Sequence, residues 1–178
     1  TTSIGARYID SEGDTWEIVA TFGPEAEIPY NATLNVEEIT PDELDYQQFY
    51  VDARRTAAKK AGKTLSEEEI LAELESKLAN DEPIPARFFD ITIVNDGEEI
   101  QPEGPVSVKI ELADTLTEDV KVVHFEHNDT NETINPPIVL DAEHVEADAL
   151  EKTVGFEAES FSVYGIVGTE TITVDYLT

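Results

Sequence analysis

Short runs in which apolar and polar residues alternate lie on both sides of a central stretch that has a different period. Residues 15–22, 89–93 and 106–112 all follow this alternation. A period of two is typical of half-buried β-strands, because successive side chains point to opposite faces of a sheet. Asn95-Asp96-Gly97 follows one of these runs and is a strong signal for a hairpin turn. The pattern therefore restricts the chain to a mainly β fold.

The central stretch carries two sets of helix signals. Thr40-Pro41-Asp42-Glu43 places a capping residue, a proline at the first helical position and a glutamate three residues after the cap. Gly62 is well placed to end this helix. Ser66 with Glu69 forms a second capping box, ahead of an apolar stripe at helical spacing. We predict helices over about 41–61 and 66–80.

Composition divides the chain into three parts: an N-terminal β part (1–40), a helical segment (41–83) and a C-terminal β-sandwich part (84–178). We expect a mainly β, α+β fold. In it, antiparallel β-sandwich-like lobes, or one sandwich in two parts, are joined by the two α-helices. Further strands are expected around a hairpin at 11–14 and at 34–36, 120–125, 154–156 and 161–167, with 171–174 as a last strand or a linker.

The charge of the chain limits its partners. It has 178 residues with 11 Lys and Arg against 40 Asp and Glu, a net charge of −29. Nucleic acid and anionic membranes are therefore not expected as partners, because a phosphate binder needs a broad cationic surface. The sequence contains no run of 18 apolar residues, so membrane insertion is not expected. Hydrophobic residues make up 40%, which indicates a folded chain despite the acidity.

Cysteine is absent, so thiol catalysis, thiolate metal sites and disulfides are excluded. Bacterial surface proteins, which avoid stray thiols, fit this composition. A chain that begins Thr1-Thr2-Ser3 without methionine is expected to be a fragment or a processed product, from which a signal peptide or a cell-wall anchor has been removed.

Three segments resemble those of a known family. They are residues 86–93 (ARFFDITI), residues 99–110, which include the run Pro-Val-Ser-Val-Lys-Ile, and residues 156–164 (FEAESFSVY). They resemble repeated β-rich modules of cell-wall-anchored surface proteins of gut commensal Firmicutes, most closely the immunoglobulin-binding, superantigen-like proteins. The resemblance covers roughly residues 15–45 and 84–168, and the helical stretch is its least typical part. It implies binding to the framework surface of host antibody variable domains, without catalysis.

Catalytic and metal sites are not predicted. His124, His127 and His144 are the only histidines, and a zinc site needs three or four converging ligands. The acidic residues of segment 10–14 do not match a twelve-residue calcium loop, and a hairpin turn explains them better. No nucleophile motif or phosphate-binding glycine loop occurs. We therefore expect no enzyme activity, no cofactor and no required metal. If a metal is bound after all, calcium is the main candidate.

A lysine–asparagine isopeptide crosslink, found in some surface proteins of this type, is a further alternative. Lys109 and Lys121 are the lysines inside predicted strands. Lys109 shares its face with Ser107 and Glu111, and Lys121 alternates with Val120 and Val122, so both are expected to point to water.

Five of the 11 cations lie within ten residues near one helix end: Arg54, Arg55, Lys59, Lys60 and Lys63. One interpretation is that they oppose the helix macrodipole and aid solubility. The other is a binding face, because aromatic and arginine residues are the usual hot spots of interfaces. The side of the helix with Leu44, Phe49, Ala53 and Ala57 is expected to pack on the sheet. The alternative, that the two tyrosines of the binding face also cover the sheet, stays open. The predicted antibody-contacting residues are Tyr46, Gln47, Tyr50, Arg54 and Arg55.

Two functions follow. The first is an immunoglobulin-binding module, monomeric within a larger multidomain chain on the bacterial cell surface. Repeats of such a module would add avidity. The second is a structural spacer in a surface stalk, in which acidity provides repulsion and solubility.

Overall fold

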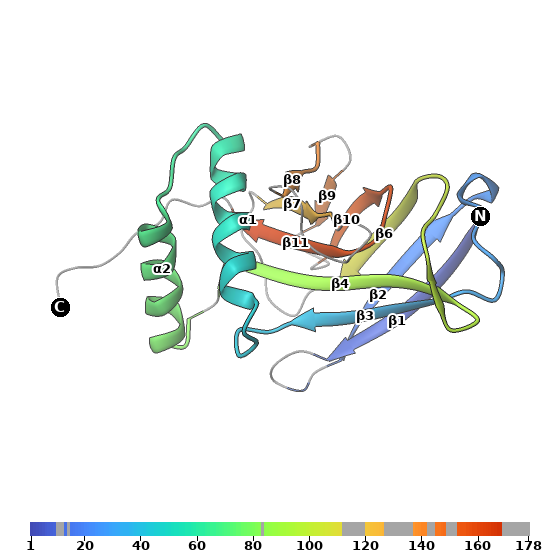
Figure 1. Cartoon of the computed structure of the whole chain (residues 1–178), viewed down its shortest axis with the longest axis horizontal. Coiled ribbons are helices and arrows are strands. Elements are labelled where there is room, and N and C mark those ends of the chain that lie inside the picture. The colour runs from blue at the N-terminus through green and yellow to red at the C-terminus, as the bar shows by residue number, and fades with distance from the viewer. Residues whose placement is uncertain are drawn as a thin grey trace.

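The computed structural model is mainly β, with two helices and two antiparallel sheets, which confirms the predicted fold class. The structure describes residues 1–9, 13, 15–82, 84–111, 120–126, 137–141, 145–148 and 153–168. Figure 1 shows the two sheets at one side of the molecule and the helices at the other.

The first sheet, sheet A, has five strands among the described residues. In spatial order they are β1 (Thr2–Ile9), β2 (Thr15–Phe22), β6 (Val106–Glu111), β10 (Thr153–Ala158) and β9 (Val145–Asp148). Strands β1 and β2 pair along their whole length, from Thr2 opposite Phe22 to Ile9 opposite Thr15. This pairing confirms the hairpin predicted around residues 11–14. Of the turn itself, only Gly13 lies within the described residues.

The second sheet, sheet B, lies over sheet A. Its strands are β3 (Thr33–Ile39), β4 (Ala86–Asn95), β11 (Val163–Gly168), β7 (Val120–Phe125) and β8 (Ile138–Val139), with β5 (Glu98–Ile100) paired to β4. The β4–β5 hairpin turns at Asp96 and Gly97, which have φ values of 53° and 81°. Both φ values lie in the left-handed region, which asparagine, aspartate and glycine adopt more readily than other residues. The Asn-Asp-Gly signal therefore predicted this turn correctly.

The predicted parts 1–40 and 84–178 are mixed in both sheets. Strand β2 pairs with β6, and β3 pairs with β4. The residues between the sheets form one core, to which Ile18, Ile91 and Ile110 contribute fully buried side chains. The compositional parts therefore share a single sandwich and do not form separate lobes, and the helical segment is inserted between two neighbouring strands.

Helix α1 (Tyr46–Lys60) is shorter at its start than predicted. The amide of Glu43 donates to the carbonyl of Thr40, and the Thr40 hydroxyl donates to the carboxylate of Asp42, so the predicted cap forms a separate turn. The predicted end is confirmed: Gly62 has a φ of 81°, and the Lys63 amide donates to the Ala58 carbonyl at 2.8 Å. This bond is the 6→1 contact of a Schellman motif.

Helix α2 (Glu67–Ala79) begins with the predicted capping box. The Glu69 amide donates to Ser66 Oγ at 3.2 Å, and the Ser66 amide donates to the Glu69 carboxylate at 3.5 Å. A short 3₁₀ helix, η1 (Pro24–Ala26), precedes β3. Figure 1 shows α1 against the strands and α2 on the side of α1 away from them. Neither helix, nor any other helix in the described part of the chain, has the length and apolar character needed to cross a membrane.

A second core cluster lies between sheet B and the helices. Phe49 of α1 meets Phe125 of the sheet edge to face, with ring centroids 4.9 Å apart, and lies tilted against Phe88 at 5.9 Å. Gly165 of β11 lies beneath Phe88, and this close approach leaves no room there for a side chain. The molecule is therefore layered as sheet A, sheet B, α1 and α2.

Candidate functional site

The five residues predicted to contact antibody divide into two groups on α1. Tyr46, Tyr50 and Arg54 are 3%, 0% and 1% exposed. Gln47 and Arg55 are exposed. The prediction that Tyr46, Tyr50 and Arg54 face a partner is therefore wrong. The alternative, that the tyrosines cover the sheet, is correct for Tyr46, whereas the hydroxyl of Tyr50 is directed to α2. The physical reason is that α1 is covered twice, by sheet B on one side and by α2 on another.

Tyr46 belongs to the core beside sheet B. Its hydroxyl donates to the Ala86 carbonyl at 3.2 Å, and its ring meets Phe88 edge to face at 5.5 Å. Burial raises the pKa of Tyr46 well above its usual value, with Glu38 adding to the shift. The polar end of this side chain is thus satisfied within the chain.

Tyr50 and Arg54 converge on one carboxylate of α2. Arg54 Nε donates to Glu73 Oε1 at 3.0 Å, and Arg54 Nη2 donates to Glu73 Oε2 at 2.8 Å. The Tyr50 hydroxyl donates to Glu73 Oε1. Glu73 is itself only 7% exposed. Arg54 therefore makes the bidentate pair expected of it, but with its own chain and not with an antibody.

The same arginine also holds the end of a strand. Arg54 Nη1 donates to the carbonyl of Gly168, the last residue of β11. The amide of Gly168 donates to the Pro85 carbonyl at 2.7 Å. Arg54 thus joins α1, α2 and sheet B. Burial, followed by the nearby charge of Glu73, raises the pKa of Tyr50 strongly, so this hydroxyl remains a donor.

Glu73 was missed by the sequence analysis, although a signal for it exists. It lies between Ile70 and Leu74, the buried members of the apolar stripe of α2. A glutamate on an apolar stripe implies a buried partner, because an unpaired buried charge is very costly.

The exposed charge on α1 lies at its C-terminal half. Arg55, Lys59, Lys60 and Lys63 are all exposed. Arg55 Nη2 lies 3.7 Å from Glu67 Oε2, and both side chains are about half exposed, at 48% and 58%. Such a pair contributes little in water. The cations therefore form a solvated patch on a chain whose net charge is −29.

A serine and a histidine meet on sheet B without forming a catalytic pair. His124 Nε2 lies 2.7 Å from Ser162 Oγ, and His124 Nδ1 lies 3.9 Å from the Glu126 carboxylate. Ser162 Oγ donates to the Phe125 carbonyl at 2.7 Å, so the imidazole must donate to Ser162. A nucleophile needs the opposite polarity. With His124 stacked on Tyr164 at 4.1 Å and buried, the arrangement is structural.

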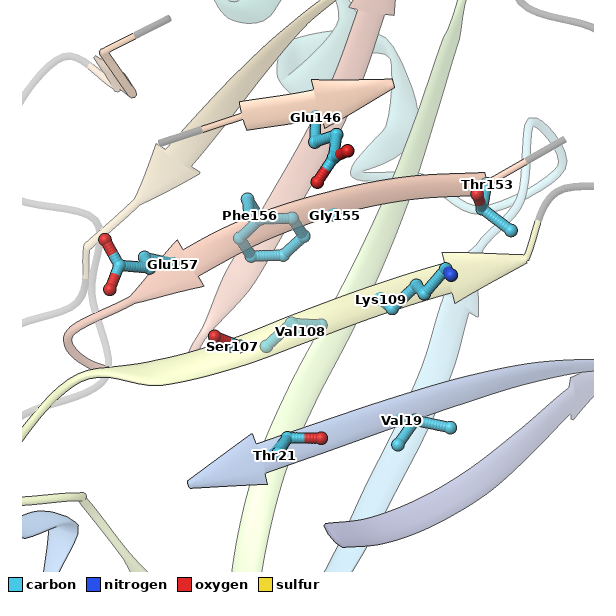
Figure 2. Close-up of a pocket in the computed structure, with 10 residues that line it drawn as sticks. All are labelled: Val19, Thr21, Ser107, Val108, Lys109, Glu146, Thr153, Gly155, Phe156 and Glu157. Carbon is cyan, nitrogen blue, oxygen red and sulfur yellow. The ribbon is translucent and has the colours of Figure 1, made fainter. Parts of the chain in front are cut away.

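A groove of about 450 Å³ lies on the outer face of sheet A, away from α1 and α2. Figure 2 shows Lys109 and Glu146 on the two strands that flank Gly155. The remaining lining residues are Val19, Thr21, Ser107, Val108, Thr153, Phe156 and Glu157. Lys109 is exposed here, as predicted, and does not enter the core where a crosslink would form. Side chains of both charges line the groove: Lys109 on one strand, and Glu146 and Glu157 on the neighbouring strands.

No cluster of three or more potential metal ligands occurs in the part of the chain that the structure describes. Most of the residues considered for metal binding, His127, His144 and the acids at 10, 12 and 14, lie outside the described residues. The same holds for most of the loop 126–137 and for the predicted element at 171–174.

Comparison with known proteins adds no assignment: no protein family, no curated protein and no solved structure matches this chain. The resemblance of residues 86–93, 99–110 and 156–164 to surface-protein modules therefore stays a prediction.

Proposed function

We propose that this chain is a non-catalytic module of a bacterial cell-surface protein and that it binds the framework of a host immunoglobulin variable domain. The resemblance of three β segments supplies the ligand class. The observation that carries the proposal is the exposed cationic patch at the C-terminal end of α1 on an otherwise acidic chain. It is formed by Arg55, Lys59 and Lys60 of the helix and by Lys63 just beyond its end. Gln47 lies at the other end of the same helix and is also exposed.

This surface has the properties that a protein-binding helix needs. The helix is fixed by its packing on sheet B, so binding does not have to order it. Within the described residues, the ion pair of Arg55 is a long contact with Glu67 in which both side chains are about half exposed. Its guanidinium fork can pair bidentately with a carboxylate of the framework. The lysines would accelerate association with an acidic surface more than they would strengthen the complex.

A charge-reversal experiment tests the proposed surface. The double variant Arg55→Glu, Lys59→Glu should bind a panel of Fab fragments at least about tenfold more weakly by surface plasmon resonance. The matched control is Arg7→Glu, Lys109→Glu, which reverses two exposed cations on the outer face of sheet A. Full binding by the first variant, or equal loss in both, would place the binding site elsewhere.

The second candidate is a structural spacer, and one observation favours it. Tyr46, Tyr50 and Arg54 are explained by packing alone, so the aromatic side of α1 no longer requires a partner. Failure of the unmodified chain to bind any Fab in the panel would support the spacer and contradict immunoglobulin binding.

A further inference from the structure

Helix α2 is the most peripheral helix of the described structure. Its main neighbour is α1, and Figure 1 shows it separated from the strands by that helix. Its buried residues are Ile70, Glu73 and Leu74, so one of the three carries a charge. Elements held by few buried apolar contacts are the ones that open first in local fluctuations. Helix α2 is therefore the part of the fold best suited to move away from its neighbour.

The surface beneath α2 is built to hold a carboxylate. The Tyr50 hydroxyl, Arg54 Nε and Arg54 Nη2 all point to Glu73. Arg54 is also fixed by the carbonyl of Gly168, which does not depend on α2. If α2 moved away, the bond to the Gly168 carbonyl would still hold the guanidinium, directed at the position that the carboxylate had left.

The other charges on the two helices also complement each other, with cations on α1 and acidic residues on α2. Along α1, Arg54 is followed by Arg55, Lys59 and Lys60. The first turn of α2 carries Glu67, Glu68 and Glu69. Chemically, α2 is an acidic amphipathic helix that covers a basic one. Its pattern Ile70-x-x-Glu73-Leu74 describes what fits the surface: two apolar side chains on either side of one carboxylate.

We propose that this α2-covered surface, formed by Tyr50 and Arg54 of α1, is a second binding surface and that α2 blocks it in the free chain. Its ligand is an acidic amphipathic helix of a partner protein, whose carboxylate replaces that of Glu73. The partner binds only the state in which α2 has opened, so it shifts the population toward that state. Its apparent affinity is reduced by the small fraction of open molecules. This inference does not depend on the immunoglobulin proposal.

A peptide experiment tests the surface directly. The probe is a fluorescent peptide with the sequence of residues 66–80, added to the full chain and followed by fluorescence anisotropy. Glu75→Pro breaks α2 at an exposed interior position, because proline removes a helical hydrogen bond there. Glu67→Pro is the matched control, since proline is tolerated at the first helical position. The peptide should bind the Glu75→Pro chain at least about tenfold more tightly than the control or the wild type.

Two peptide variants identify the carboxylate that is recognised. The peptide carrying Glu73→Ala should bind the opened chain at least about tenfold more weakly, because it lacks the carboxylate that accepts hydrogen bonds from Arg54 and Tyr50. The peptide carrying Glu75→Ala, which removes the same charge from an exposed position, should bind like the parent. Equal binding by both peptides, or none by a Glu75→Pro chain with an intact near-ultraviolet spectrum, would overturn the proposal. So would unfolding of the sandwich in that variant, because α2 would then be part of the core.

Discussion

Replacing Glu73 by leucine tests whether the contact between the helices depends on charge. The change keeps an apolar side chain of similar size but leaves the Arg54 guanidinium, which is 1% exposed, without its carboxylate. Removing one partner of a buried ion pair costs about 3–5 kcal/mol. A chain of this size loses roughly 2–4 °C of Tm per kcal/mol, so Glu73→Leu should lower the Tm by about 6–20 °C.

A double-mutant cycle separates this charge effect from simple loss of packing. Arg54→Met alone should be similarly harmful, because it leaves the buried Glu73 carboxylate with Tyr50 as its main donor. The double variant Arg54→Met, Glu73→Leu contains neither charge. It should lose about 2–3 kcal/mol less than the sum of the two single changes. A residual cost remains, because Tyr50 and the Gly168 carbonyl each lose a hydrogen-bond partner.

The measurement is equilibrium unfolding in urea, followed by the fluorescence of Trp16, the only tryptophan, and by far-ultraviolet circular dichroism. Trp16 packs at the core between the sheets, so it reports global unfolding, whereas the dichroism includes the helices. Additive single changes, or a loss below about 1 kcal/mol for Glu73→Leu, would refute the argument that a buried charge is left uncompensated.

Gly165→Ala should destabilise the fold by about 1–3 kcal/mol, because the new Cβ would lie 2.7 Å from the ring of the buried Phe88. The control in the same unfolding assay is Gly155→Ala, whose Cβ would meet nothing closer than 3.6 Å. Ser66→Ala should cost about 1 kcal/mol, measured as a loss of α2 protection in hydrogen exchange. Stability should fall above about pH 10, since the tyrosines of the unfolded chain ionise there while the buried ones, whose pKa values are raised, stay protonated. A tyrosinate absorbance that rises gradually without unfolding would contradict this expectation for Tyr46, Tyr50 and Tyr164.

Local signals were sufficient for most of the strands and for one helix. The alternation over residues 15–22 and 106–112 predicts which side chains are buried, and Ile18, Ala20 and Ile110 are indeed fully buried. The capping box at Ser66 predicts the start of α2 to within one residue. These features depend on neighbours in the sequence, so they can be predicted without knowing the tertiary structure.

Other elements depend on tertiary contacts and were not predictable in the same way. Strand β8 has two residues and exists through its pairing with β7. Strand β9 was missed because Val145–Asp148 is mostly polar or small and pairs only at its β10 edge within the described structure. The turn at residues 40–43 uses the same residue types as a helix cap, so the start of α1 was predicted five residues too early.

The orientation of α1 could not be predicted, because the number of surfaces that cover a helix is not a local property. The side with Leu44, Phe49, Ala53 and Ala57 was expected to pack on the sheet. The two alanines are indeed fully buried, whereas Leu44, which precedes the helix, is 99% exposed. The neighbouring side, with Tyr50 and Arg54, is covered by α2. A helix covered on two sides buries most of its circumference, so spacing alone cannot identify a free face.

Tyrosine and arginine on a helix are a weak indicator of an interface in a chain this acidic. The same side chains mark hot spots and buried polar junctions, since both situations require a large apolar body with a polar end. Which of the two occurs depends on whether a carboxylate of the same chain can reach them, and with 40 acidic residues against 11 cations one often can. Arg54 found Glu73, whereas Arg55, one position further round the helix, reached only an exposed contact at 3.7 Å. Cations that remain solvated in such a chain are therefore better candidates for partner contacts than those beside aromatic residues, which directs the search from Tyr50 and Arg54 to Arg55 and Lys59.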